Sequence, residues 1–229
     1  MSIYALSDLH LSFGTDKPMD VFGGKWENYS EKIYENWQSV VSDEDLVIIP
    51  GDVSWATYLE DAYEDFKFID GLNGRKVILK GNHDYWWSTL RKMEGFLEGN
   101  NLSSIKILYN TAFAFDDAAI CGTRGWSSQE DEDDIRIYDR EKRRLILSLE
   151  EAVKLRKDRI IVGMHYPPLS ADGNDKSFIE IMKYYGVSDC VYGHLHSFAH
   201  KNAIVGDCEG INLMLVSGDY TNFAPVLVK

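Results

Sequence analysis

The sequence has 229 residues, which is enough for one large domain with a full hydrophobic core. Its 45% apolar and 27% charged residues are ordinary for a soluble globular protein, and its net charge of −13, without a long Lys/Arg stripe, disfavours non-specific binding to nucleic acid. Cys121, Cys190 and Cys208 are odd in number and form no Cys-x-x-Cys pair, so they support neither a disulfide framework nor a thiolate zinc site.

The first hundred residues alternate between two hydrophobic patterns. Short apolar runs that predict buried strands occupy residues 3–7, 46–50 and 77–79. Apolar residues at helical spacing predict helices over residues 27–41, 56–70 and 87–97. Strands that alternate with helices are typical of βαβ units and a largely parallel sheet.

The pattern changes after residue 100. Three closely spaced apolar runs at 105–109, 111–115 and 118–122 predict an antiparallel meander. Helices are expected at 138–157 and about 176–185, and further strands at 160–163, 190–193 and within 203–228. We expect an α/β fold with an added antiparallel portion, forming a single domain over residues 1–229.

Five consecutive acidic residues, 130–134, lie before the long predicted helix. They could form a calcium or partner site, but a solvated loop is the favoured interpretation. At the N-terminus, a strand is expected to begin at once, and no signal-peptide pattern precedes it. No run of 18 apolar residues occurs, so we expect a cytoplasmic protein without membrane partners.

Five of the six histidines follow a strand-like run and stand beside Gly or Asp. They are His10, His83, His165, His194 and His196. In open α/β sheets, ligands bind beyond the carboxyl ends of the strands, so five imidazoles at strand ends would converge on one rim. The sixth, His200, stands outside this pattern and is expected to be structural or on the surface.

Carboxylates follow the same rule. Asp8 lies two residues before His10, Asp52 follows Gly51, and Asp84 follows His83. In an extended segment, residues i and i+2 point to the same side, so Asp8 and His10 could serve one cleft, as could His194 and His196. Glycines 51, 81 and 193 let the backbone approach closely or turn sharply.

Such a cluster predicts a metal centre. Imidazole, carboxylate and amide ligands without thiolate suit divalent Mn, Fe, Zn, Co and Ni ions. The candidate ligands exceed what one tetrahedral zinc ion takes, whereas two metal ions about 3.5–4 Å apart would use such a set.

In chain order, these residues form a set of motifs, namely Asp8-Leu9-His10, Gly51-Asp52, Gly81-Asn82-His83-Asp84, the lone His165 and Gly193-His194-Leu195-His196. The set resembles that of the calcineurin-like metallophosphoesterase superfamily, in particular its compact prokaryotic phosphodiesterases. The resemblance spans residues 8–196. It implies a four-layer α/β/β/α sandwich of two mixed β-sheets flanked by helices.

The resemblance also implies roles for these residues. Two divalent transition-metal ions would be held, one by Asp8, His10, Asp52 and His196, the other by Asp52, Asn82, His165 and His194. His83 would act as general acid while Asp84 orients its ring. A small phosphodiester or phosphomonoester would then be hydrolysed by a metal-bound hydroxide.

Departures narrow the choice of relatives. Gly51-Asp52-Val53-Ser54-Trp55 differs from the Gly-Asp-x-Val-Asp-Arg-Gly of protein phosphatases in this superfamily. Ser7–Leu11 is similar to lipid-precursor pyrophosphate hydrolases, but we see no basic amphipathic segment for a membrane surface. Two alternatives are a nuclease, which the acidic balance disfavours, and a non-catalytic metal-binding interaction scaffold, which would be expected to lack His83 or several ligands.

Further residues beside the motifs have two interpretations. Arg124 follows a predicted strand and either binds a substrate phosphate with its guanidinium fork or is structural. Aromatic residues adjoining the motifs either wall the pocket or, as we favour, pack in the core: Trp86, Trp87, Trp126 and Tyr166.

Overall fold

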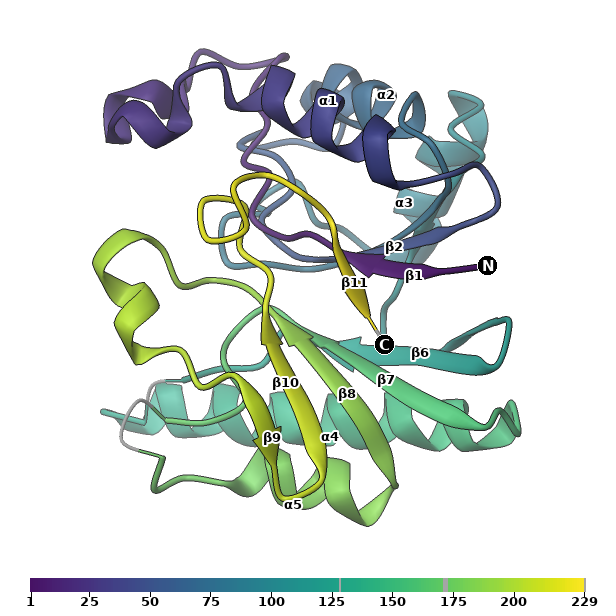
Figure 1. Ribbon diagram of the computed structural model, residues 1–229, viewed down its shortest axis with the longest axis vertical. Coiled ribbons are helices and arrows are strands. Elements are labelled where there is room, and N and C mark those ends of the chain that lie inside the picture. Colours follow the sequence, from purple (N-terminus) through teal and green to yellow (C-terminus); the bar gives the residue numbers. More distant parts are fainter. Residues whose placement is uncertain (128, 171–172, 229) are drawn as a thin grey trace.

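The computed structural model describes residues 1–127, 129–170 and 173–228. Its elements form four layers, because two β-sheets face each other and helices cover the outer side of each sheet (Figure 1). This confirms the predicted sandwich of two mixed sheets flanked by helices. Among the described residues, no helix combines the length and the apolar character needed to cross a membrane.

The first sheet has five strands in the order β11-β1-β2-β3-β4. Its strands are β1 (Ile3–Ala5), β2 (Leu46–Pro50), β3 (Arg75–Leu79), β4 (Ile105–Ile107) and β11 (Val226–Val228). Strands β1 to β4 run parallel to one another, and β11 returns from the C-terminal end to pair antiparallel with β1. The helices that alternate with these strands are α1 (Tyr29–Val40), α2 (Tyr63–Asp70), preceded by η3 (Glu60–Ala62), and α3 (Leu90–Gly99).

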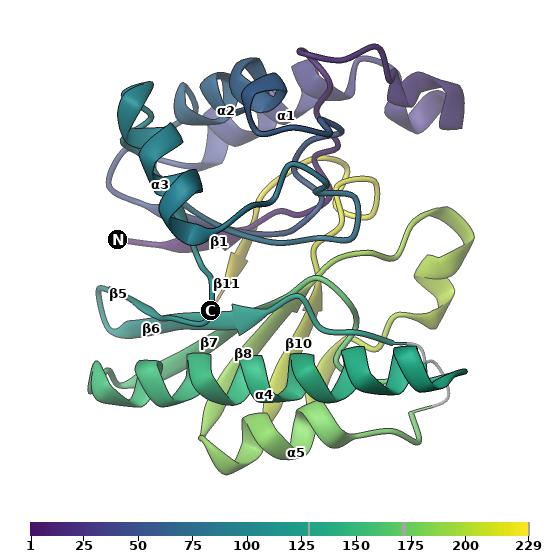
Figure 2. The same ribbon diagram turned by 180° about the vertical axis from the view of Figure 1, so that it is seen from behind.

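The second sheet has six strands in the order β5-β6-β7-β8-β10-β9. They are β5 (Phe113–Phe115), β6 (Ala118–Thr123), β7 (Arg159–Met164), β8 (Val187–Tyr192), β9 (Gly206–Cys208) and β10 (Ile211–Leu215). The central strands β6, β7, β8 and β10 are parallel to one another, and the edges are antiparallel. Helices α4 (Glu132–Lys154) and α5 (Ser177–Tyr184) cover its outer face (Figure 2).

Strand β2 shows why the sequence forms this layered core. All five of its residues are buried, which is typical of a strand covered on both faces. Alternate side chains point in opposite directions, so Leu46 and Ile48 pack between the two sheets, while Val47 and Ile49 pack against the helices of the first layer. One continuous apolar run therefore serves two separate apolar layers.

The predicted three-stranded meander is wrong. Only β5 and β6 form an antiparallel hairpin, whereas β4 belongs to the other sheet and runs parallel to β3. The physical reason is the helix α3, which returns the chain so that β3, α3 and β4 form one βαβ unit. The chain passes from the first sheet to the second between β4 and β5, and apolar periodicity carries no information on that exchange.

The acidic run 130–134 begins a helix instead of forming the expected loop. The side chain of Asp131 caps α4 by accepting a hydrogen bond from the backbone N of Asp134 at 2.8 Å, and residues 132–134 form the first turn. Negative charge at this end is favourable because the backbone N–H groups there carry partial positive charge. The helix consequently begins six residues before the predicted boundary at residue 138.

Three short helical segments lie at the end of the molecule toward which the parallel strands point. Segments η1 (Met19–Phe22) and η2 (Gly24–Trp26), drawn in purple, follow β1, and η4 (Ser197–Asn202), drawn in light green, follows β8 (Figure 1). All three lie at the same end of the sandwich. The loops that carry the sequence motifs lie at this end because they follow the carboxyl ends of β1, β2, β3, β7 and β8.

Candidate metal centre

Four of the expected ligands have left-handed backbone conformations. The φ angles are 59° at Asp8, 45° at His10, 52° at Asp52 and 72° at His194. Such values are uncommon for residues other than glycine and cost free energy, so they persist only where the surrounding structure imposes them. The strands therefore end in sharp turns at the ligand positions, and strain of this kind is concentrated at functional sites.

The motif positions 51, 81 and 193 require glycine because neighbouring atoms lie where a Cβ atom would be. Gly51 has a φ of +95°, and a Cβ atom there would lie 2.6 Å from the Cα of Gly81 and 2.8 Å from Nδ1 of His165. A Cβ atom at Gly81 would overlap Asp52, and one at Gly193 would overlap the side chains of Ser7 and Asp8. Larger residues at these positions would push the candidate ligands apart.

A first group of ligand atoms comes from Asp8, His10 and His196, which all lie within 4.8 Å of one another. Nε2 of His196 lies 3.4 Å from Nε2 of His10 and 3.5 Å from Oδ1 of Asp8. Oδ2 of Asp52 lies 3.7 Å from Nε2 of His10. His10 and His196, which are 186 residues apart in sequence and follow β1 and β8, thus meet at one point.

A second group lies on the other side of Asp52. Nε2 of His165 is 3.5 Å from Oδ2 of Asp52 and 2.6 Å from Oδ1 of Asn82. The same Asn82 oxygen is 2.9 Å from Nδ1 of His194. The structure thus brings all seven predicted ligands together, and Oδ2 of Asp52 is close to a histidine from each group.

Acidic side chains are concentrated in this cage. Asp8, Asp52 and Asp84 are buried, and in the described part of the chain none of them has a Lys or Arg ion pair within 4 Å. Burial and the neighbouring carboxylates of Asp84 and Asp8 raise the pKa of Asp52 well above its usual range. Burial opposes ionisation of Asp8, but its hydrogen bond to His196 and the positive charge of that ring hold the pKa of Asp8 well below its usual range.

Three of the imidazoles are held in the neutral form that binds metal ions. Burial lowers the pKa of His10 and of His165 to about 3, and that of His194 to about 4. His196 differs, because hydrogen bonds to Asp219 and Asp8 outweigh burial and raise its pKa to about 10. A cation in the first group would therefore have to displace a proton from His196.

His83 and Asp84 do not make the predicted contact. The Asp84 carboxylate accepts hydrogen bonds from the backbone N atoms of Asp52, Val53, Ser54 and Gly81 and from Nε1 of Trp86. Nδ1 of His83 is buried without a hydrogen-bond partner in the described chain. Asp84 thus fixes the backbone of the loops after β2 and β3, because its carboxylate is surrounded by their N–H groups.

The ring of His83 is held by packing instead. It lies against Trp55, with ring centroids 4.5 Å apart, and its backbone N donates to Oδ1 of Asp52 at 2.8 Å. Trp55 also stacks on His10 at 5.0 Å. Sequence reasoning assigned no role to Trp55, although it stands three residues after Asp52 of the Gly51-Asp52 motif.

Asp219 is a buried site residue that the sequence analysis missed. Its Oδ1 lies 2.8 Å from Nδ1 of His196 and 3.3 Å from Nε2 of His200, and its Oδ2 accepts from the backbone N of Ser197 at 3.0 Å. A carboxylate behind a ligating imidazole fixes the ring orientation and raises its basicity. The signal was present, because Gly218-Asp219 follows an apolar run as Gly51-Asp52 does. His200 therefore supports Asp219, in agreement with the structural role expected of it.

The remaining candidates surround the cage. Arg124 lies 3.9 Å from the carboxylate of the buried Glu141 and over the ring of Trp126, at 4.8 Å. Trp86 is buried in the core as expected, edge-on to Phe66. Tyr166 instead contacts the site directly, because its ring centroid is 4.2 Å from that of His194.

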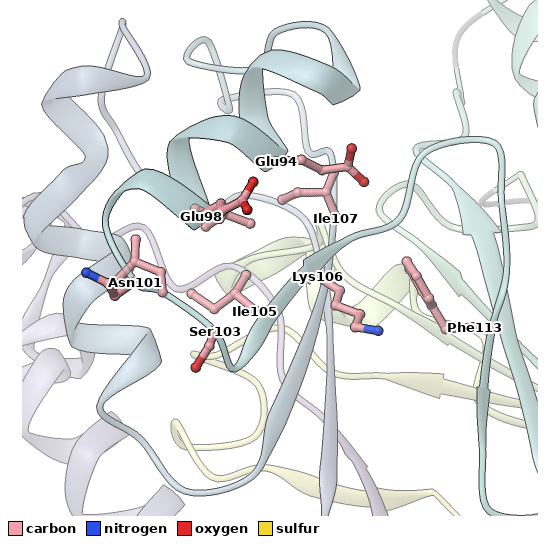
Figure 3. Close-up of a pocket in the computed structure, with 10 residues that line it drawn as sticks. Glu94, Glu98, Asn101, Ser103, Ile105, Lys106, Ile107 and Phe113 are labelled. Atoms are coloured by element: carbon pink, nitrogen blue, oxygen red, sulfur yellow. The ribbon is translucent and has the colours of Figure 1, made fainter.

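A surface groove lies away from the candidate ligands. A groove of about 610 Å³ runs between α3 and the edge strand β4, and its lining includes Glu94, Glu98, Lys106 and Phe113 (Figure 3). None of the predicted ligands lines it. Size therefore does not identify the candidate site, whereas the convergence of ligand atoms does.

The donor set of the cage fits a pair of divalent ions. The group of Asp8, His10 and His196 and the group of Asp8, Asp52 and His165 overlap at Asp8, and Oδ2 of Asp52 is close to His10 and to His165. In the described chain, the buried carboxylates have no Lys or Arg ion pair within 4 Å. Buried carboxylates without compensation are costly, and divalent cations would supply it. Oxygen and imidazole ligands without thiolate suit first-row transition metals.

Comparison with known proteins agrees with this geometry. The model of the calcineurin-like phosphoesterase family matches residues 1–198. The chain belongs to the calcineurin-like phosphoesterase family. Family membership and the ligand cluster together support a metal-dependent phosphoesterase.

Individual relatives of this chain are distant. An uncharacterized protein of Methanocaldococcus jannaschii is 28% identical over 97 residues, which is 40% of this chain and 52% of that protein, so the match spans about half the length of that relative. Among solved structures, TT1561 of Thermus thermophilus has a TM-score of 0.59 at 11% identity, with 99% of this chain and 97% of that chain covered. A phosphopantetheinyl hydrolase of Mycobacterium tuberculosis has a TM-score of 0.54 at 13% identity, with coverages of 99% and 95%. At such identities the structures show a shared fold.

Proposed function

We propose that this protein hydrolyses a small phosphate ester, a diester or a monoester, with two divalent transition-metal ions such as Mn, Fe or Zn. The observation that carries the proposal is the convergence of seven side chains with oxygen or nitrogen ligand atoms, Asp52 among them. Asp8, His10, Asp52 and His196 would hold one ion, and Asp52, Asn82, His165 and His194 the other. When bound, such ions act as Lewis acids toward phosphoryl oxygens and lower the pKa of water toward neutrality.

The chain's own residues would prepare the reaction. Asp52 links the two ligand groups and also binds the backbone N of His83, so the position of the candidate acid is tied to that of the ions. Asp84 holds the loops of both residues through their N–H groups. Since alignment of reacting groups supplies much of an enzyme's rate, this shared support would keep phosphate and proton donor in register.

His83 is proposed to donate the proton to the leaving oxygen. It is half-buried, and burial lowers the pKa of its imidazole in the protein alone. A bound phosphate anion would act in the opposite direction, because a nearby negative charge favours the imidazolium form. Its unpartnered Nδ1 leaves the ring free of a competing hydrogen bond in the described chain, and Trp55 limits its rotation.

Hydrolysis of bis-p-nitrophenyl phosphate and p-nitrophenyl phosphate tests the proposal. The protein would be stripped with a chelator and assayed before and after addition of Mn²⁺, with His83→Ala as a control for contaminating enzymes. We expect turnover that depends on the metal and is lost in the variant. Metal-restored hydrolysis of equal rate in His83→Ala would contradict the role of His83, and no hydrolysis of either ester by metal-loaded protein would contradict the proposed activity on simple esters.

A further inference from the structure

A small basic pocket lies beside the candidate metal centre. It is formed where the ends of β3 and β6 meet α4, and the residues that define it are Lys80, Trp87, Thr123, Arg124, Glu141 and Arg144. Its volume is about 20 Å³, which is room for one oxygen-sized group. We call it the basic pocket.

Positive charge exceeds negative charge in this pocket. Three cationic side chains line it, against the single carboxylate of Glu141. That carboxylate is already saturated, because it accepts from Oγ1 of Thr123 at 2.6 Å and from the guanidinium of Arg144 at 2.8 Å, with Arg140 at 3.4 Å. The surplus of positive charge stands out in a chain whose net charge is −13.

Hydrogen-bond donors in the basic pocket have no acceptor. Nε1 of Trp87 and Nε of Arg124 are both buried and unpartnered in the part of the chain that the structure describes. Lys80 has no ion pair within 4 Å in the described part of the chain, whereas Arg124 and Arg144 both lie within 4 Å of Glu141. Buried donors without partners are costly, and each calls for a water molecule or a ligand. Water would satisfy the donors, but it would leave the surplus charge uncompensated, whereas an anionic oxygen would satisfy both.

The basic pocket is connected directly to the candidate ligands. Lys80 immediately precedes Gly81-Asn82. The carbonyl oxygen of Arg124 accepts hydrogen bonds from the backbone N of His165 at 3.1 Å and of Tyr166 at 2.9 Å. The backbone N of Trp87 donates to the carbonyl oxygen of Asp84 at 3.2 Å. The pocket therefore adjoins the ligand group of Asn82 and His165 and is held rigidly against it.

We propose that the basic pocket binds a second anionic group of the substrate, a carboxylate or a phosphate, by admitting one of its oxygens. Arg124, Lys80 and the indole N–H of Trp87 would donate hydrogen bonds to that oxygen. Those from Arg124 and Lys80 would be strong because both partners are charged. The substrate would then be a phosphate ester that carries a second anion at a distance from the scissile phosphate. This inference rests on the proposed function, because the scissile phosphate is placed at the metal centre.

Calorimetric titration of the Mn²⁺-loaded protein with phosphonates tests the inference without turnover. Each ω-phosphonocarboxylate of one to four methylene groups would be compared with the alkylphosphonate of the same chain length, which lacks only the carboxylate. For at least one chain length, we expect the carboxylate to lower Kd by about tenfold. In Arg124→Gln, this advantage should fall to about twofold or less, while Arg136→Gln, which removes an exposed arginine of α4 outside the pocket, should retain it.

A second variant covers the case in which Arg124→Gln does not fold. Trp87→Phe keeps an aromatic ring but removes the unpartnered N–H, and we expect it to reduce the carboxylate advantage about threefold. Binding of alkylphosphonates without any advantage for the carboxylates would overturn the basic pocket alone, as would an advantage that survives in both variants. Failure of both phosphonate series to bind would overturn this inference together with the proposed metal centre.

Discussion

The two sheets contribute different chemistry to the candidate centre. Asp8, Asp52 and Asn82 follow strands of the first sheet and supply every ligand oxygen, together with the ring of His10. The second sheet supplies only imidazoles, from His165, His194 and His196. The first sheet therefore carries the charge that would attract cations, whereas the second carries imidazole nitrogens that would complete their coordination. Substitutions on the two sides should accordingly differ in kind.

Asp52→Asn should have the largest effect. Oδ2 of Asp52 is close to both His10 and His165, and its other oxygen accepts from the backbone N of His83. Loss of the shared charge would weaken both metal sites and misplace the acid, so we expect metal affinity and turnover to fall by about 100-fold or more. Metal content by mass spectrometry, beside ester hydrolysis, checks this. Retention of two ions at wild-type affinity would mean that Asp52 is not shared between them.

His83→Ala should separate chemistry from metal binding. The side chain is not among the predicted ligands and lies against Trp55, so its removal should leave metal content unchanged. We expect turnover to fall by about 10²- to 10⁴-fold, as for loss of a general acid. If the variant lost a metal ion instead, His83 would have to be reassigned as a ligand.

Asp219→Asn should act on the second sheet's side of the centre. Asp219 bonds Nδ1 of His196 and helps to raise the pKa of that ring to about 10. A neutral amide would hold the ring less firmly, and we expect a loss of about 10- to 100-fold in affinity at one metal site. In the wild type, the proton on His196 competes with metal over the range below about pH 10, so affinity should rise with pH. This slope should be shallower in Asp219→Asn, as measured by competition with a chelator, and identical slopes would exclude action through His196.

Lys76→Met should have the smallest effect, and it concerns stability. Lys76 is buried on β3, and burial lowers the pKa of its amine to about 8. The unfolded chain, with a lysine pKa of about 10.4, binds more protons between about pH 8 and pH 10.4, so the wild type should gain stability as pH rises through that range. Lys76→Met should lack this gain. Urea unfolding at several pH values checks the difference, and parallel profiles for the two proteins would contradict it.

Sequence was informative where one local rule decides the structure. Candidate ligands were found because each stands beside the end of an apolar strand, and the sheets bring those ends together. The same rule would have found Asp219, since Gly218-Asp219 repeats the pattern of Gly51-Asp52. Spacing also located α1 and α5 to within a few residues, because their buried faces repeat at the helical period.

Features that depend on contacts between distant segments could not be predicted from local sequence patterns. Nothing local distinguishes β4, which joins the first sheet, from β5, which joins the second. The family resemblance implied that Asp84 would orient His83, but the N–H groups of residues 52–54 and 81 surround its carboxylate instead. Trp55 contacts His83 only because the loop after β2 lies over it.

The number of metal ions that support hydrolysis tests the central claim most directly. Metal-free protein would be titrated with Mn²⁺, and bound metal and hydrolysis of bis-p-nitrophenyl phosphate and p-nitrophenyl phosphate would be followed in the same samples. The account predicts that activity appears only as the second equivalent binds, and that both equivalents are lost together in Asp52→Asn. Full activity with one equivalent, or two bound equivalents without hydrolysis of either ester, would contradict it.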